Sequence, residues 1–230
     1  MTAPSPLAAA ALPVAPVREH VVKNLREAIV TGVLAPGQKL VEAKLCEDLG
    51  VSRASLREAL RQLEAERLIH IVPFKGPTVA DMTWDEASQI YEVRELLEGH
   101  AAFLFASLAT DEALRTMREA LAEFDAAVKK GNARVLVTST RRFYDVMLAG
   151  CRNRVIEDFL NGLNARISLL RSRSMSDPGR AVQSAKEMRA MYTALAARKP
   201  EAARKAAMDH VRKARKTAQR VLASTAEAGR

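Results

Sequence analysis

The sequence predicts a mainly α-helical protein, in which an N-terminal winged helix-turn-helix with a small β-wing precedes an all-α antiparallel six-helix bundle. Hydrophobic residues make up 48% of the 230 residues and aromatic residues only 4%, which favours helices and excludes a disordered protein. Residues 17–81 hold short helical patterns and one hairpin pattern, whereas residues 82–224 hold only long helical patterns. We expect residues 1–16 to form a disordered tail and residues 225–230 a C-terminal tail.

Three helices are expected after the N-terminal tail. A helix over Val17–Thr31 carries apolar residues at helical spacing on one face. A second helix is expected over Leu40–Leu49, and Gly50 can take the left-handed conformation that commonly ends a helix. Ser52 can accept a backbone hydrogen bond as the N-cap of a third helix, with Ser55 in its first turn. Two helices joined by so short a break are typical of a helix-turn-helix.

The third helix carries a stripe of three arginines. Arg53, Arg57 and Arg61 repeat every four residues, so their guanidinium groups lie on one face, away from a leucine face. Arginine bonds bidentately to guanine edges or clamps phosphates, so this helix suits the major groove of DNA. A solvated face of a core helix can carry the same stripe, but the short turn before it favours DNA binding.

A hairpin is expected after the third helix. Leu68–Val72 and Thr78–Ala80 predict two short strands around a turn that contains Lys75 and Gly76. A wing with a lysine and a glycine can approach the minor groove closely. A plain surface hairpin without a DNA contact explains this segment equally well.

Six long helices are expected after Met82. The first begins where Thr83 and Glu86 have the spacing of a capping box. The starts of the other five are marked by Thr110-Asp111, Asn132, Asn153, Asp177-Pro178 and Pro200. The last helix is expected to end near Leu222. Helices of this length without strand signals between them predict an antiparallel bundle.

The net charge of +9 is unevenly distributed. Residues 17–80 carry ten basic and eight acidic side chains, a net charge of about +2, whereas residues 141–230 carry twenty and eight, about +12. Specific DNA binding by the first part must therefore depend on where its arginines lie rather than on bulk charge. The basic C-terminal part can assist the attraction of DNA phosphates, attract an anionic ligand or pack against residues 82–140, whose net charge is about −4, and the last two are favoured.

Other classes of protein are disfavoured. No apolar run approaches the roughly 18 residues that cross a bilayer, and the Ala/Pro-rich opening lacks the regions of a signal peptide. Cys46 and Cys151 have no metal or redox spacing and fit the reducing cytoplasm. No Gly-rich phosphate loop, activated nucleophile or convergent carboxylate pair is present, so we predict no catalytic residues and no enzyme.

The N-terminal part closely resembles the winged helix-turn-helix of the GntR family. The stretches that carry the resemblance are Ile29–Leu40 (IVTGVLAPGQKL), Leu49–Arg53 (LGVSR) and Leu56–Glu64 (LREALRQLE). It implies a homodimeric regulator that binds a palindromic operator in double-stranded DNA, with Arg53 and Arg57 as the main reading residues. The residues predicted to contact DNA are Ser52, Arg53, Ser55, Arg57, Arg61, Lys75 and Gly76.

One residue departs from the pattern of that family. The family usually has a glycine where this chain has Arg67. A left-handed conformation there costs a residue with a side chain roughly 1 kcal/mol. We therefore expect the helix end to differ slightly while the DNA-reading face is kept.

The helical part resembles the FCD effector domain, whose opening motif is matched by Arg94–Glu98 (RELLE). The resemblance implies that a small effector binds in the bundle and changes DNA affinity. Most members bind a divalent metal through one Asp and three His. The corresponding residues here are Thr140, Tyr144, Met188 and His210, a poor ligand set for Zn, Mn or Ni. We predict no metal and no cofactor.

A metal-free site can still bind a small organic acid. Arg94 would supply positive charge, Tyr144 a phenol, His210 a donor to a carboxylate and Met188 adaptable apolar surface. The candidate effector-binding residues are thus Arg94, Thr140, Tyr144, Met188 and His210. We expect a cytoplasmic repressor. In the alternative, Tyr144 and Met188 fill the cavity, and the bundle only dimerises an architectural DNA-binding protein.

Overall fold

A computed structural model describes residues 14–72, 74 and 76–228 of the chain. The chain divides into two compact units between Asp81 and Met82, the point at which the sequence pattern changes. Within the described residues the protein is mainly helical, with one two-stranded antiparallel sheet, and the predicted fold class is confirmed. No helix in these ranges is long and apolar enough to cross a membrane.

The first unit contains helices α1 (Val14–Val30), α2 (Glu42–Leu49) and α3 (Arg53–Ala65). Helix α1 begins three residues before the predicted Val17 and so includes residues 14–16 of the predicted tail, while residues 1–13 lie outside the described ranges. Helix α2 begins two residues later than predicted. Leu40 precedes it in extended backbone, because its N–H donates to the carbonyl oxygen of Pro77 at 2.8 Å.

The turn between α2 and α3 has the predicted capping residues. Gly50 has φ +63° and ψ +37°, and its N–H points back to the carbonyls of Cys46 and Glu47. Ser52 caps α3, since its side chain accepts from the N–H of Ser55 at 3.2 Å. The apolar face of α3 packs against that of α1. The buried residues of the two faces are Val21, Leu25, Ile29, Leu56, Leu60 and Leu63.

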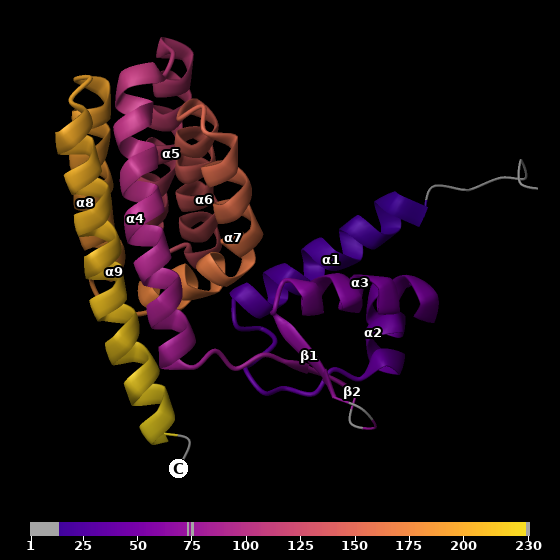
Figure 1. The fold of residues 1–230 in the computed structure, drawn as a ribbon. Helices are drawn as coiled ribbons and strands as arrows, with labels where there is room; N and C mark the ends of the chain where they lie inside the picture. Colours follow the sequence, from indigo (N-terminus) through magenta and orange to yellow (C-terminus); the bar gives the residue numbers. More distant parts are fainter. Residues whose placement is uncertain (1–13, 73, 75, 229–230) are drawn as a thin grey trace, which may run out of the picture. The chain divides into compact units, whose positions relative to one another are not determined.

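The wing is an antiparallel pair of β1 (Ile69–Val72) and β2 (Gly76–Val79), in which Val72 pairs with Gly76 (Figure 1). Strand β2 begins two residues before the predicted Thr78. Pro77 suggests a turn in the sequence, but here it pairs with Ile71 inside the sheet. The N–H of Ile71 donates to Glu64 and the carbonyl of Pro77 accepts from Leu40, so this pair exchanges no hydrogen bonds between the strands and can hold a residue without an N–H.

Within the described residues, the second unit is a bundle of six helices, which Figure 1 shows. They are α4 (Trp84–Leu108), α5 (Asp111–Lys130), α6 (Ala133–Gly150), α7 (Arg154–Met175), α8 (Arg180–Ala196) and α9 (Pro200–Ala228). The capping box of Thr83 and Glu86 is confirmed, and Thr110, Asn132 and Asn153 cap α5, α6 and α7 as predicted.

Two helix boundaries in the bundle differ from the prediction. Helix α8 begins at Arg180 rather than at Asp177-Pro178, because the N–H of Arg180 donates to the carbonyl of Asp177 and Gly179 is left-handed at φ +81°. Helix α9 continues past Leu222 to Ala228. Residues 225–228, predicted as part of a C-terminal tail, are therefore helical.

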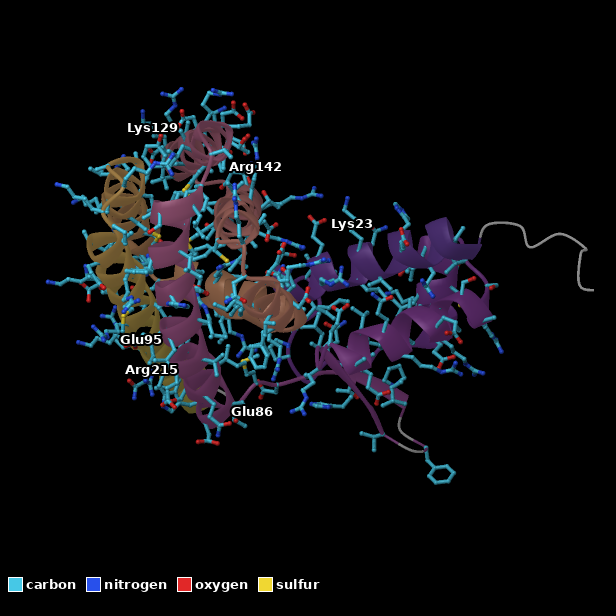
Figure 2. The ribbon with its side chains drawn as sticks, turned by 45° about the horizontal axis from the view of Figure 1, so that its top comes forward. Lys23, Glu86, Glu95, Lys129, Arg142 and Arg215 are labelled. Atoms are coloured by element: carbon cyan, nitrogen blue, oxygen red, sulfur yellow. The ribbon has the colours of Figure 1, made fainter. Side chains whose placement is uncertain are left out.

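Helices α4 and α9 lie side by side and run antiparallel (Figure 1). A Cβ on Gly99 would lie 2.7 Å from Cγ of Met208, so the glycine allows the two helices to approach closely. Arg215 of α9 donates to Ser88 and Glu92 of α4. Figure 2 shows Arg215 and Glu95 among the side chains along the outside of these helices. The charged residues of this seam are in contact with solvent.

Candidate functional site

The arginine stripe of α3 lies on its exposed face. The side chain of Arg57 is 60% exposed, and its Nε donates to Glu42 at 3.0 Å. Arg61 is 67% exposed and pairs with Glu58 on the same helix. Exposed ion pairs of this kind contribute little to stability. A phosphate or a guanine edge can therefore replace either carboxylate at small cost, and the stripe is free to contact DNA.

The two serines at the start of α3 serve the helix itself. Ser52 caps the helix, and its hydroxyl lies 3.1 Å from that of Ser55. This places exposed Arg53 in the first turn, next to N–H groups that attract phosphate. The predicted DNA residues from Ser52 to Arg61 thus belong to a single helix and its N-cap.

The wing supplies the remaining predicted DNA residues. Gly76 has φ +81°, the left-handed conformation that a glycine adopts without strain. The predicted contact Lys75 lies outside the described residues. Phe74 is fully exposed with φ +64°. Sequence reasoning missed this residue, although an aromatic side chain in a predicted turn was the available signal.

Arg67 has the backbone conformation that was expected to strain it. Its φ is +56°, in the region that favours glycine. The N–H of Arg67 donates to the carbonyl of Glu64, and that of Leu68 donates to Leu63. The helix therefore ends in the glycine-type conformation, so the expected difference at this end is wrong, whereas α3 begins at its predicted N-cap Ser52.

In the second unit Arg94 is buried, with an exposure of 1%. The sequence suggested that it offers a free positive charge, but in the structure its charge is paired. Its Nε donates to Glu98 at 2.7 Å, one turn along α4. Burial alone would lower the pKa of Arg94, but the adjacent Glu98 carboxylate outweighs burial and raises it. The Nη1 atom has no hydrogen-bond partner among the described residues. Arg94 therefore keeps one unused donor while most of its charge is compensated.

Tyr144 of α6 lies next to two other functional candidates. Its ring centroid is 6.2 Å from that of His210, and the guanidinium of Arg171 lies 4.4 Å from its ring. The phenol oxygen is buried and makes no hydrogen bond of standard geometry within the described residues, although the Glu98 carboxylate lies close enough to help raise its pKa. Burial raises the pKa of Tyr144, so its hydroxyl stays protonated and can donate.

Arg171 of α7 is a candidate that sequence reasoning missed. It is 7% exposed and has neither an ion pair nor a hydrogen bond within the described ranges. Burial lowers the pKa of Arg171, and so does the nearby charge of Arg94. The available signal was its position among apolar residues at helical spacing, beside buried Ile167 and Leu170. A buried arginine ordinarily has an acidic partner, so an arginine in an apolar stripe indicates either an ion pair or a binding site for an anion.

His210 contacts a carboxylate of the protein itself. Its Nδ1 lies 2.8 Å from Oε2 of Glu187, and both Nη atoms of Arg180 donate to that oxygen at 2.9 Å. Burial alone would raise the pKa of Glu187, but the hydrogen bonds from His210 and Arg180 hold it at about 2. Burial lowers the pKa of His210 and favours the neutral ring. Arg180 and Glu187 were not among the predicted site residues, because their burial was not foreseen.

Thr140 and Met188 complete the predicted effector set. The hydroxyl of Thr140 donates to the carbonyl of Leu136 at 2.7 Å, within its own helix, so only its lone pairs can face a ligand. Met188 is fully buried and adds apolar surface.

The residues at the metal positions of the family do not fit a divalent ion. In the part of the chain that the structure describes, no three His, Cys, Asp or Glu side chains gather closely enough to hold one. The imidazole of His210 is hydrogen-bonded to Glu187, and the guanidinium of Arg171 lies over Tyr144. A second cation would meet positive charge and a neutral phenol there.

A groove with a volume of about 710 Å³ runs along the beginning of α8 and the adjoining part of α9. Its lining includes the buried residues Arg180, Glu187 and Thr217 and the exposed residues Lys213 and Arg220. The charge of Arg180 also acts on Tyr91, whose pKa it lowers against the larger raising effect of burial. The groove therefore reaches the buried pair of Arg180 and Glu187.

The chain matches two family models. Residues 17–79 match the model for bacterial regulatory proteins of the gntR family, and residues 89–213 match the FCD domain. Among curated relatives, the Glc operon transcriptional activator of Escherichia coli K12 is 28% identical over 87% of this chain and 88% of its own length. The galactonate operon transcriptional repressor of the same strain is 28% identical over 83% and 91%.

A solved structure has a similar fold. A GntR transcriptional regulator from Rhodococcus sp. RHA1 superposes with a TM-score of 0.76, covering 89% of this chain and 98% of that one. The two sequences are 22% identical, so this similarity supports the fold alone.

Proposed function

This chain belongs to the GntR family of bacterial transcriptional regulators and carries an FCD domain, and we propose that a small organic anion inside the bundle controls its affinity for operator DNA. One observation carries the proposal: polar groups of several helices are buried without partners. The unpartnered atoms include the hydroxyls of Tyr91, Tyr144, Ser174 and Ser184, Nη1 of Arg94, and Nε of Arg171 and Arg180.

Several of these groups lie close to one another: the guanidinium of Arg94 lies 5.1 Å from the ring of Tyr91, and that of Arg171 lies 4.4 Å from the ring of Tyr144. The charges of Arg94, Arg171 and Arg180 all act on the phenol of Tyr91, although these residues come from α4, α7 and α8. Each buried donor without an acceptor costs about 1–3 kcal/mol. A carboxylate accepts about four hydrogen bonds and donates none, so it matches such a set. The site residues in this proposal are Arg94, Thr140, Tyr144, Met188 and His210, with Tyr91 and Arg171 added.

The DNA-binding part of the proposal places one α3 in the major groove of each half-site. A homodimer would present two copies of the Arg53, Arg57 and Arg61 stripe to a palindromic operator, with Lys75 and Gly76 of each wing at the minor groove.

We propose that the bound dimer represses transcription in the cytoplasm, as the name of the galactonate relative suggests, although the Glc relative is an activator by name. In a transcription assay, added protein should lower transcript from a promoter that carries the operator. A rise in transcript would make it an activator.

The DNA-reading role of α3 is tested by Arg57→Ala. The operator is first selected from random duplexes with the native protein, and binding is then measured by fluorescence anisotropy. Each lost contact should cost about 1–3 kcal/mol per half-site, which weakens specific binding by about 5- to 150-fold for each. Lys23→Ala is the matched control, because Lys23 is exposed on α1, outside the stripe. Equal affinities of Arg57→Ala and native protein would contradict the assignment.

The second candidate is a ligand-independent architectural DNA-binding dimer. The internal pairs of Arg94 with Glu98 and His210 with Glu187 favour it, because they satisfy part of the site without a ligand. The two candidates differ in one measurement, the release of operator DNA by organic acids. Release by at least one acid, at a concentration that also raises the melting temperature, supports the effector proposal. Unchanged operator binding and melting temperature across organic and sugar acids would support the architectural candidate.

A further inference from the structure

We propose that Phe74, at the tip of the wing, inserts between two stacked base pairs of the operator from the minor groove and so bends the DNA. The proposal rests on the DNA-binding part of the proposed function and deepens it. The arginines of α3 read base edges in the major groove, whereas Phe74 selects base steps that unstack easily.

The first argument is the exposure of apolar side chains at the tip of the wing. The side chain of Phe74 is completely exposed, and no other large apolar side chain among the described residues matches it, since the next is Val155 at 79%. Ile71 and Val72, the last residues of β1, are 39% and 40% exposed. Successive residues of a strand point to opposite faces, so the tip is apolar on both sides. An exposed apolar patch of this kind indicates a binding surface.

The second argument is the backbone that carries Phe74. Val72 and Gly76 form the last pair of the sheet, so residues 73–75 connect the strands and Phe74 is the middle residue of the connection. Its φ is +64°, in the left-handed region that a bulky side chain rarely occupies. Glycine or asparagine adopts this conformation with less strain. Because strained residues gather at functional sites, an aromatic ring held in water by such a backbone points to a function of the ring.

The wing is fixed to the helix that is proposed to enter the major groove. The N–H of Ile71 donates to the Glu64 side chain of α3 at 3.1 Å. On the other strand, the carbonyl of Pro77 accepts from the N–H of Leu40 at 2.8 Å. These bonds support the tip relative to α3. A wedge needs such a support, because unstacking a base step costs free energy.

The chemistry of the hairpin favours DNA over a lipid bilayer. Residues 69–80 contain no Asp or Glu, so no side chain of the hairpin repels phosphates. A phenyl ring stacks on bases of any sequence, and architectural DNA-binding proteins use phenylalanine, leucine or isoleucine as wedges in the minor groove. Binding at a membrane surface requires a larger apolar face than one ring and two half-buried aliphatic side chains.

The first test measures bending and unstacking with the full-length protein and the operator selected from random duplexes. Bending is measured by energy transfer between dyes at the two ends of the duplex. Unstacking is measured by the fluorescence of 2-aminopurine, which replaces each adenine in turn. The native protein should bend the operator by about 20–90° and should raise the fluorescence at one position in each half-site. Phe74→Asn, which tolerates the left-handed backbone but lacks the ring, should lose most of both signals.

Two further variants control this comparison. Phe74→Leu keeps an apolar side chain at the tip and should retain most of the bend. Phe159→Asn removes a phenylalanine that is 54% exposed on α7, in the second unit, and should bend DNA as the native protein does. Equal bending by Phe74→Asn and the native protein would overturn the proposal.

The second test compares the operators that the native protein and Phe74→Asn select from random duplexes. The native protein should enrich a pyrimidine–purine step at one position in each half-site, because such steps unstack easily. Replacement of that step should weaken native binding by about tenfold and the binding of Phe74→Asn by less than about twofold. Both proteins should select the same bases at the positions that α3 reads.

The possible outcomes separate the wedge from DNA binding itself. If the native protein binds a selected operator without bending it, or if both proteins select the same steps, the wedge is wrong and the DNA-reading role of α3 is unaffected. If the native protein selects no operator, both proposals are wrong. Binding to phosphatidylglycerol vesicles that Phe74→Asn loses, together with an unbent operator, would assign the tip to a membrane and overturn the proposal.

Discussion

The exposed arginines of the first unit lie around an apolar interior, whereas three arginines of the second unit lie inside the interior of that second unit. Arg57 and Arg61 are 60% and 67% exposed, and their ion pairs lie in water. Arg94 and Arg171 are 1% and 7% exposed among helices that are far apart in sequence. The same side chain is therefore used in two opposite environments within one chain.

This difference matches the size of the ligand that each unit is proposed to bind. DNA is large and must be met at a surface, where exposed guanidinium groups give up weak pairs for phosphates and bases. A small anion can be enclosed, and the low dielectric of the interior then strengthens each contact with it. The cost is that some hydrogen-bond donors and one charge of the buried cluster have no partner when the ligand is absent.

The largest expected effect tests this contrast through stability. Glu98→Gln should remove the carboxylate that compensates Arg94 and leave two buried guanidinium groups unpaired, destabilising the second unit by about 3–5 kcal/mol. Glu58→Gln removes an exposed partner of Arg61 and should change stability by at most about 0.5 kcal/mol. Urea unfolding is followed by circular dichroism and by the fluorescence of Trp84, the single tryptophan, in α4. Similar effects of the two variants would contradict the contrast.

Acid should weaken the second unit next. The pKa of Glu187 is held at about 2 in the folded state, so its contribution is present above the unfolded value of 4.5 and is lost as the pH falls toward 2. The loss should reach about 3 kcal/mol. The pKa of His210 is also lowered by burial, which adds a loss as the pH falls below 6.5.

The measurement is urea unfolding of the second unit between pH 7 and pH 3, with the fluorescence of Trp84 as the signal. Glu187→Gln should flatten the dependence below pH 4.5. The control is Glu201→Gln, because the Glu201 side chain is 75% exposed at the start of α9. An equal acid dependence of Glu187→Gln and the native protein would show that this buried carboxylate is not responsible.

Two glycine-to-alanine substitutions test how closely the side chains in the interior of the second unit are packed. A Cβ on Gly150 would lie 2.5 Å from the ring of buried Phe105, so Gly150→Ala should destabilise by about 1–3 kcal/mol. A Cβ on Gly162, inside α7, would meet no atom within 4 Å, so Gly162→Ala should stabilise by about 0.5–1 kcal/mol. Thermal unfolding of both variants gives the two signs. Stabilisation by Gly150→Ala would mean that the interior is loose as well as charged.

The smallest expected effect concerns backbone strain that the two units share. Arg67 in the first unit and Arg152 in the second have φ of +56° and +54°. Replacement of either by glycine should stabilise its unit by roughly 1 kcal/mol, because a side chain is disfavoured in this conformation. Urea unfolding of each single variant tests this. A loss of stability in only one unit would show that this arginine makes compensating contacts there.

Local features could be predicted from the sequence with good accuracy. Ser52, Thr83 and Asn132 begin their helices as predicted, because a cap depends on a side chain and a backbone N–H three residues away. The start of α8 could not be predicted in this way, since Gly179 and the hydrogen bond from Arg180 to Asp177 replace a side-chain cap. The start of α2 was missed because Leu40 bonds to Pro77, a residue distant in sequence.

The effector site shows the same limit. Tyr144 and His210 were chosen by their positions in a motif, and the structure brings their rings within 6.2 Å. Arg171 was missed, because an arginine is ordinarily exposed and its burial follows from how α7 packs against α4 and α6. The role of Glu187 was missed for the same reason, since Arg180 bonds to it from two turns away on α8 and His210 reaches it from α9.

Sequence alone determined the family, the two classes of helix and the arginine stripe of α3, since periodicity and capping act over a few neighbouring residues. Only the tertiary structure decided which charges are buried and which of them are paired. Arg94, Arg171 and Glu187 come from three helices, and their environment depends on how those helices pack. Because burial changes the energy of a charge by several kcal/mol, packing determined where the second unit can bind an anion.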